Sequence, residues 1–218
     1  MNVTIIIAAY NEEKHIEHVI KRVQKQGCTN IIVVDDGSKD STYEKALKTR
    51  VTVLKHAVNL GKGAAVRTGC DYAIAQGTDY LVLLDGDGQH EPEEIKRFTK
   101  ELHTHDIVFG MRKRSKEMPL LYRVGNWGLT LYTRLLFGIN IYDSQCGYRA
   151  MTADAYKKIR WDANDYGMES EMIARAGKHS LRHKEIIIKT IYHEKYKGTG
   201  VGDGIKIAIN MLKWRLIL

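Results

Sequence analysis

Apolar runs of strand length alternate with helical patterns through the first half of this chain, and no other feature constrains the fold as strongly. Strands are expected at residues 3–9, 31–34, 51–54, 80–84 and 106–109. The first helix is expected to start at Asn11 as its N-cap and to run to about Gln26. Further helices are expected at residues 41–47, 61–76 and 92–102. This order predicts an α/β fold, with a mostly parallel central sheet flanked by helices and joined by right-handed crossovers.

Polar and acidic side chains stand at the carboxyl ends of three of these expected strands. Tyr10 follows the first strand, Asp35 and Asp36 end the second, and Asp85 and Asp87 end the fourth. Ligands of open α/β sheets bind outside the carboxyl ends of the strands. We therefore expect these side chains to converge on one site.

Asp85 and Asp87 give the clearest indication of chemistry. They are separated by one glycine at the end of an apolar run, and residues i and i+2 of an extended chain point the same way. Two such carboxylates suit Mg²⁺ or Mn²⁺, which then bridges to phosphate oxygens of a substrate. Gln89 adds a neutral oxygen on the same side. For an isolated pair of this kind, a simple acidic turn is the alternative interpretation.

The two commonest nucleotide-binding fingerprints are absent. The glycines around Lys62 do not form a dinucleotide-binding motif, because position 66 is Val66, and Gly63 replaces the Ser or Thr of a Walker A loop. The start of this helix is interpreted either as a phosphate site or as a tight turn. The segment DDGS at 35–38 is likewise either a turn or an acceptor for a base N–H or a ribose hydroxyl.

The net charge of +8 and the isoelectric point near 9.3 favour anionic partners, although a basic balance also serves solubility alone. The sequence has no nucleic-acid-binding signature beside this charge, so no nucleic acid partner is expected. Three distant cysteines predict neither a zinc site nor a disulfide framework. We expect no signal peptide and no membrane-spanning helix, because the apolar runs are too short. A cytoplasmic protein is therefore expected.

The second half is less regular. Residues 120–142 are rich in Leu, Tyr, Trp and Phe with inserted arginines, and residues 205–218 are expected to form an amphipathic C-terminal helix. Both segments suit peripheral attachment to a membrane surface, and packing on the sheet or on another subunit is the alternative. The glycine-rich stretch 198–204, preceded by Lys195, is expected to be a flexible loop.

Four motifs together carry a family resemblance. They are IAAYNE at 7–12, VDDGS at 34–38, NLGKG at 59–63 and DGDGQH at 85–90. In this order they closely resemble family 2 glycosyltransferases of the GT-A fold. The later segments GMR at 110–112, RVGN at 123–126 and DSQCGYR at 143–149 resemble the polyprenyl-phosphate branch, which includes dolichyl-phosphate mannose and glucose synthases.

The resemblance implies a role for each matching position. Ala8, Tyr10, Glu12 and Asp36 would hold the nucleoside of the donor, with Val34 and, at the diphosphate, Lys195 as further donor-binding residues. Asp85 and Gly86 would contact the donor, while Asp87 and Gln89 would bind Mg²⁺ or Mn²⁺ on the diphosphate. Arg112 would hold phosphate between donor and acceptor, and Arg123 is a second candidate for the acceptor phosphate. Asp85, Asp87 and Arg112 are thus the expected catalytic residues.

The implied activity is metal-dependent, inverting transfer of a sugar from a nucleotide diphosphate to a polyprenyl or dolichyl phosphate. Ala8 replaces the usual proline of mannose synthases, and Lys195 and Val201 replace an arginine and a lysine. UDP-glucose or UDP-N-acetylglucosamine therefore fits at least as well as GDP-mannose. Some relatives carry transmembrane helices beyond this point, so a membrane partner subunit is a further expectation. Residues 1–110 would bind the nucleotide sugar, 111–204 the acceptor, and 205–218 would be the C-terminal helix.

Three alternatives compete with this interpretation. A family 2 glycosyltransferase with a polysaccharide or other soluble sugar acceptor is the nearest, and dependence on a polyprenyl phosphate separates the two. A non-catalytic nucleotide-sugar-binding protein is disfavoured by the intact carboxylates and Gln89. A nucleotidyltransferase is disfavoured because residues 8–12 lack the glycine- and arginine-rich loop of that class.

Overall fold

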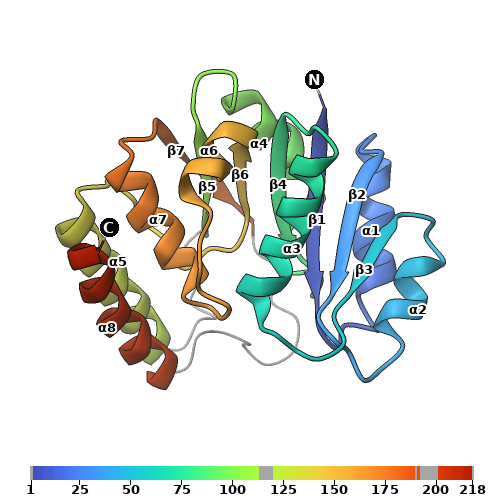
Figure 1. Ribbon diagram of the computed structural model, residues 1–218, viewed down its shortest axis with the longest axis horizontal. Coiled ribbons are helices and arrows are strands. Elements are labelled where there is room, and N and C mark those ends of the chain that lie inside the picture. The colour runs from blue at the N-terminus through green and yellow to red at the C-terminus, as the bar shows by residue number, and fades with distance from the viewer. Residues whose placement is uncertain (1, 113–119, 190, 192–200, 218) are drawn as a thin grey trace.

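The structure, a computed structural model, describes residues 2–112, 120–189, 191 and 201–217. In this part of the chain, one sheet has the strand order β3-β2-β1-β4-β6-β5-β7 (Figure 1). The strands are β1 (Val3–Ala9), β2 (Asn30–Asp35), β3 (Thr52–Lys55), β4 (Tyr80–Asp85), β5 (Ile107–Arg112), β6 (Arg149–Thr152) and β7 (His183–Ile188). All pairings are parallel except those of β6, which runs antiparallel between β4 and β5. The mostly parallel α/β sheet predicted from the sequence is confirmed.

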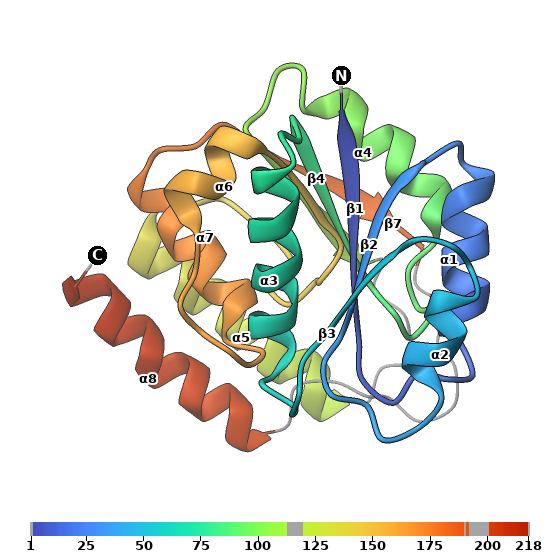
Figure 2. The ribbon, with the colours of Figure 1, turned by 45° about the vertical axis from the view of Figure 1, so that its right-hand side comes forward.

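Helices cover both faces of the sheet (Figure 2). They are α1 (Ile16–Lys25), α2 (Thr42–Leu47), α3 (Lys62–Ala75), α4 (Ile95–Glu101), α5 (Leu120–Phe137), α6 (Ala153–Ile159), α7 (Met168–Lys178) and α8 (Val201–Ile217), with a 3-10 turn at Pro92–Glu94. Ile5 and Ile7 of β1 pack with α1, α2 and α4, whereas Ile6 packs with α3, α6 and α7. This split follows from the two-residue period of a strand, and it explains why the central strands are apolar on both faces.

The first helix begins later than its sequence predicts. Asn11 is not the N-cap: its φ is +55°, and its side chain accepts a hydrogen bond from the N–H of Lys39 at 2.9 Å. The N–H of Glu12 donates to Thr42 Oγ1 at 2.8 Å, and α1 starts only at Ile16. These contacts to the segment after β2 override the local capping signal, and they fix the rim of the sheet next to Tyr10.

The elements of the second half were largely missed by sequence reasoning. Strand β6 has four residues and β7 is an edge strand of mixed polarity, so neither shows a clear periodicity. The predicted glycine-rich loop is wrong at 201–204, because helix α8 begins at Val201 and Gly204 lies near Leu129 of α5. Residues 198–200 lie outside the described part.

Helices α5 and α8 pack side by side at one end of the sheet, next to α7 (Figure 1). Among the described side chains of α8, Ile207 and Met211 are buried, whereas Lys206 and Lys213 are exposed and Asn210 is half-buried. The amphipathic C-terminal helix is therefore present and packs on protein through one face. Among the described residues, no helix has the length and apolar content needed to cross a bilayer.

Candidate active site

A cavity of about 600 Å³ lies at the carboxyl ends of β1, β2 and β4. The predicted site residues that line it are Ala8, Tyr10, Glu12, Asp36, Asp85, Gly86, Asp87, Gln89 and Arg112. Val34 does not line it, because its side chain is fully buried and faces α3, close to Gly69. A direct contact of Val34 with a ligand is therefore not supported. Lys195 and the side chain of Arg123 lie outside the described residues.

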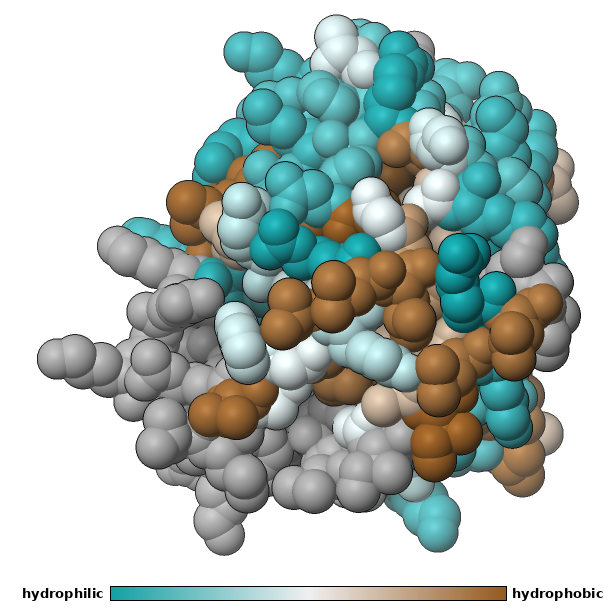
Figure 3. Space-filling model, turned by 90° about the vertical axis from the view of Figure 1, so that its left-hand side faces the viewer, coloured by the Kyte–Doolittle hydropathy of each residue, from teal (hydrophilic) through white to brown (hydrophobic). Residues whose placement is uncertain are grey.

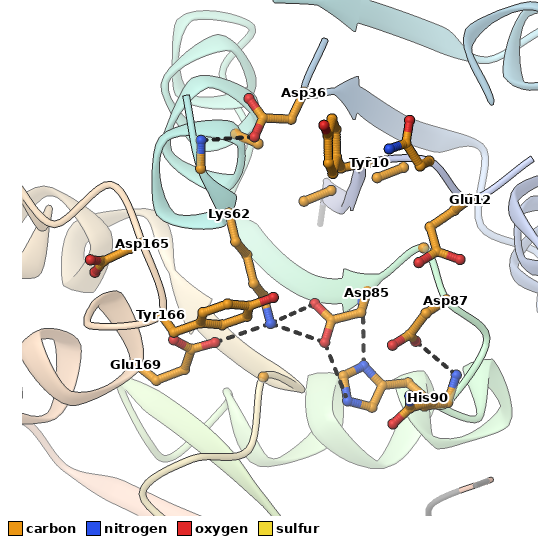
Figure 4. A pocket seen from close by; sticks show the side chains of 18 of the residues that line it. Tyr10, Glu12, Asp36, Lys62, Asp85, Asp87, His90, Asp165, Tyr166 and Glu169 are labelled. Carbon is orange, nitrogen blue, oxygen red and sulfur yellow. Dashed lines mark hydrogen bonds and ion pairs between the residues drawn. The ribbon is translucent and has the colours of Figure 1, made fainter. Parts of the chain in front are cut away.

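Asp85 is held by Lys62, the second residue of the GKG segment. The Lys62 Nζ lies 2.8 Å from Asp85 Oδ1 and 3.0 Å from Oδ2, and it also lies 3.0 Å from Glu169 Oε1 (Figure 4). Burial alone would raise the pKa of Asp85, but the charge of Lys62 lowers it below its ordinary value. The two carboxylates in turn raise the pKa of Lys62 despite its burial. Asp85 is therefore an ionised carboxylate in a fixed position.

His90 supports Asp85 from the other side. The backbone N–H of Asp85 donates to His90 Nδ1 at 3.3 Å, and His90 Nε2 lies 3.9 Å from Asp85 Oδ2. Burial lowers the pKa of His90, although the neighbouring carboxylates oppose this shift. A neutral imidazole with its proton on Nε2 satisfies both contacts. The ring packs against Tyr148, which stacks on Phe98.

Asp87 and Gln89 follow the strand in a tight turn. The N–H of Gln89 donates to Asp87 Oδ1 at 2.9 Å, and Gly88 between them has φ +75°. No group of three His, Cys, Asp or Glu side chains suited to a metal ion occurs among the described residues. Mg²⁺ rarely needs one, because it is usually bound by one or two carboxylates together with substrate phosphates and water. One carboxylate and one amide oxygen facing the same cavity fit that type of site.

Asp36 is buried at the end of β2 and accepts three hydrogen bonds. They come from the backbone N–H of Leu60 at 3.0 Å, that of Gly61 at 2.8 Å, and His56 Nδ1 at 2.7 Å. Gly61 has φ +99°, and a Cβ there would lie 2.3 Å from Asn164 O. The GKG segment is therefore a tight helix start bound to Asp36, and both Gly61 and the side chain of Lys62 line the cavity.

Arg112 is oriented by an ion pair with Asp143. Its Nε and Nη2 donate to Asp143 at 2.7 and 2.8 Å, and its backbone N–H donates to the same carboxylate at 3.1 Å. Burial opposes ionisation of Asp143, but the charge of Arg112 lowers its pKa below the usual value. Glu185 accepts the backbone N–H groups of Tyr142 and Asp143, so the segment that carries this pair is anchored to β7.

Sequence reasoning gave several cavity residues no individual role in the site. They are Asn59, Lys62, Gln145, Gly147, Asp165, Tyr166 and Glu169. Arg149 of β6 places part of this set: it is fully buried and donates to the carbonyls of Ser144, Cys146 and Glu169 at 2.7–2.9 Å. The available signal was the pair of glutamates Glu169 and Glu171 at the start of the helical stretch 168–178.

The sequence of the chain matches one protein family and many relatives. Residues 4–160 match the family described as Glycosyl transferase family 2. The UDP-N-acetylglucosamine–dolichyl-phosphate N-acetylglucosaminyltransferase of Methanococcus voltae is 38% identical, covering 97% of this chain and 95% of that protein. The undecaprenyl-phosphate mannosyltransferase of Micrococcus luteus is 31% identical, covering 99% and 95%.

The fold also matches solved structures. Glucosyl-3-phosphoglycerate synthase from Mycobacterium tuberculosis, crystallised with Mg²⁺ and uridine diphosphate, superposes with a TM-score of 0.78. The match covers 98% of this chain and 79% of that one at 18% sequence identity. At this identity the likeness establishes the fold, and it agrees with the GT-A architecture predicted from the motifs.

Proposed function

The chain belongs to glycosyl transferase family 2, and we propose that it moves a sugar from a nucleotide diphosphate onto the phosphate of a polyprenyl lipid. The observation that carries the proposal is the convergence of Asp85, Asp87, Gln89 and Arg112 on one cavity at the carboxyl ends of the strands. Relatives that span nearly the whole chain are named for transfer to dolichyl or undecaprenyl phosphate. UDP-N-acetylglucosamine is the first donor to test, followed by UDP-glucose and GDP-mannose.

The nucleoside would lie along the ends of β1 and β2. Tyr10, 39% exposed at the rim, offers a ring for stacking, and Glu12 and Asp36 flank the same part of the cavity (Figure 4). Lys195 remains a candidate for the diphosphate. Asp87 and Gln89 would hold Mg²⁺ or Mn²⁺, which when bound neutralises charge on the leaving diphosphate. Asp85, fixed by Lys62 and His90, would face the donor where the diphosphate joins the sugar.

The acceptor phosphate would approach Arg112. Asp143 sets the plane of this guanidinium, and Arg123 is the second candidate on α5. A phosphate monoester has a second pKa of about 6, so it is largely ionised at neutral pH and needs no general base. The task of the protein is then to bring two anions together, which Arg112 and the positive net charge favour. Membership of the family implies a single displacement with inversion at the sugar carbon, and we include it in the proposal.

Radiolabel transfer into organic-extractable lipid tests the proposal, using a panel of UDP- and GDP-sugars with dolichyl phosphate and Mg²⁺ or Mn²⁺. Label in the lipid phase from one donor would identify the sugar. Aqueous label with release of nucleotide diphosphate would instead indicate a soluble sugar acceptor. Asp87→Ala should abolish transfer, whereas Asp154→Ala, on the exposed surface of α6, should not. Near-normal transfer by Asp87→Ala would contradict the assigned role.

We also propose peripheral attachment at the cytoplasmic face of a membrane through α5 and α8, with a membrane partner subunit as an additional anchor. The exposed apolar side chains there are Val124, Trp127, Leu131 and Leu135 of α5 and Ile209, Leu212 and Leu216 of α8. Figure 3 shows apolar side chains interspersed with polar ones at this end of the molecule. Exposed Lys213 and Arg215 add cations that suit an anionic surface.

Vesicle flotation tests this attachment. Truncation of α8 would not test membrane binding alone, because it would also remove Ile207 and Met211, whose side chains are buried in the protein. Replacing Trp127 and Leu216 with serine should reduce binding to vesicles that contain phosphatidylglycerol, whereas Leu47→Ser on α2 should not. Unchanged flotation of the double variant, or loss of a dimer in place of loss of binding, would point to a protein interface.

A further inference from the structure

Glu169 is a buried acid that the site assignments so far leave without a function. It is the second residue of α7, and its side chain is 4% exposed at the wall of the cavity. Oxygen Oε1 is bound by Lys62, but Oε2 has no hydrogen-bond partner in the part of the chain that the structure describes. A buried acceptor without a partner carries a free-energy penalty that a ligand donor would remove.

Glu171, two residues further along the helix, is a buried acid with a structural role, and it serves as a comparison for Glu169. Its side chain is 1% exposed, and both of its oxygens are used. They accept the backbone N–H of Asp162 at 3.0 Å, that of Ala163 at 2.8 Å, and Arg175 Nε at 2.8 Å. Glu171 therefore closes the loop before α7. Glu169 lies on the same helix at similar depth but keeps one acceptor unused at the cavity.

The position of Glu169 limits what its ligand can be. Figure 4 shows Tyr10 and Asp36 on one side of the cavity and Tyr166 and Glu169 on another, with Asp85 joined to Glu169 through Lys62. In a nucleotide sugar the diphosphate joins the nucleoside to the sugar, so an extended donor with its diphosphate near Asp85 and its nucleoside on the Tyr10 side has its sugar on the Glu169 side. A diphosphate offers only acceptors, whereas a sugar hydroxyl can donate to a carboxylate.

We propose that Glu169 determines sugar specificity: its Oε2 accepts a hydrogen bond from a hydroxyl of the transferred sugar. This inference rests on the proposed function. Lys62, Asp85 and Glu169 together carry one positive and two negative charges, so the pocket selects a neutral sugar and disfavours an acidic one. A buried polar group made to pair with a hydroxyl also rejects analogues that lack it.

Calorimetric titration of donors in the presence of Mg²⁺ tests this without any lipid acceptor. The probes are UDP, GDP, UDP-glucose, UDP-N-acetylglucosamine, GDP-mannose, UDP-glucuronic acid and the deoxyfluoro analogues of the best neutral donor. Fluorine removes the hydroxyl as a donor. One fluorinated position should weaken binding to the native protein by about 10- to 100-fold, the range of a hydrogen bond to a charged group. UDP-glucuronic acid should bind more weakly than UDP-glucose.

The variants separate this role from a structural one. In Glu169→Gln the amide NH₂ can face the sugar while the amide oxygen faces Lys62, so the parent donor should bind about tenfold or more weakly and discrimination against the fluorinated analogue should vanish. Glu169→Asp keeps the charge and withdraws the oxygens, and should also lose discrimination. Glu171→Gln should lower thermal stability but leave the discrimination intact. UDP alone should bind the native protein and all folded variants equally.

Several results would overturn the inference. If no single fluorinated position weakens binding to the native protein tenfold, Glu169 does not recognise a hydroxyl, and this holds even if the variants fail to fold. Equal discrimination by the native protein and Glu169→Gln would have the same meaning. If UDP binds normally in these cases, the proposed function stands. If neither UDP nor GDP binds, the proposed function and this inference fall together.

Discussion

Replacing Lys62 with methionine is expected to destabilise the whole fold as well as to impair the site. The ammonium group of Lys62 lies within 3.0 Å of both Asp85 and Glu169, whose side chains are 24% and 4% exposed. Methionine fills a similar volume but leaves two carboxylates facing each other without this cation. Breaking a buried ion pair by removing one partner costs about 3–5 kcal/mol.

The expected magnitude follows from the unequal exposure of the two acids. Asp85 can regain part of its hydration, so most of the penalty comes from Glu169, and we expect a loss of about 2–4 kcal/mol. For a chain of this size, each kcal/mol lowers Tm by about 2–4 °C, which gives a fall of about 5–15 °C. In the native protein the charge of Lys62 lowers the pKa of Asp85, so this carboxylate contributes stability that is present above its unfolded pKa and is lost as pH falls through the lowered pKa. The variant lacks this contribution, so it differs most from the native protein near neutral pH.

Thermal unfolding of the native protein and the variant between pH 4 and pH 8 measures the effect. The difference in Tm should be largest at pH 8 and should narrow toward pH 4. Lys157→Met is the matched control, because its pair with Asp154 is exposed and should change stability by no more than about 0.5 kcal/mol. Adding Glu169→Gln to Lys62→Met should restore part of the loss. A fall in Tm equal to that of Lys157→Met at all pH values would refute the reasoning.

Three further predictions follow from contacts in the cavity. A Cβ at Gly147 would lie 2.8 Å from the Lys62 Nζ, so Gly147→Ala should lower the free energy of unfolding by about 1–3 kcal/mol and weaken the binding of UDP-sugars. Unchanged affinity in calorimetry would contradict the fixed position of Lys62. Burial raises the pKa of Cys146 to about 12, so Cys146→Ala should turn over within about threefold of the native rate, and a hundredfold loss would reveal a nucleophile. Asp143→Asn weakens the ion pair that orients the Arg112 guanidinium, so it should reduce kcat/KM for transfer by about 10- to 100-fold and leave the affinity for UDP unchanged. Weakened UDP binding would instead place Asp143 on the nucleotide side.

The first half of the fold could be predicted because each element there follows from local periodicity. The strands from Val3 to Ala9 and from Tyr80 to Asp85 are apolar on both faces, as buried parallel strands must be. The start of α1 could not be predicted, because Asn11 and Glu12 bond to the segment after β2, which is distant in sequence. The antiparallel β6 was missed because four residues are too few to show a period.

The candidate site also has one part that could be predicted from the sequence and one part that could not. Asp85, Asp87 and Asp36 stand at strand ends, where the sequence marks them, and the structure brings them to one cavity. The part of the site that comes from α7 depends on tertiary packing, because Arg149 donates a hydrogen bond to the carbonyl of Glu169 at the start of that helix. The sequence alone therefore does not show which of Glu169 and Glu171 faces the cavity. The structure separates them, because both oxygens of Glu171 accept hydrogen bonds whereas Oε2 of Glu169 has no partner among the described residues.

The position of β6 in the sheet affects how the chain folds while it is being synthesised. Strands β4 and β5 follow each other in the sequence, yet β6, synthesised about forty residues later, lies between them. A nascent chain that ends after β5 can form the parallel half of the sheet, but the outer edge of β4 stays unpaired until Arg149–Thr152 leaves the ribosome. That edge is a template for mispairing in the interval. Substitutions in β6 should therefore show first as a lower yield of folded protein, and only afterwards as lower stability of the molecules that do fold.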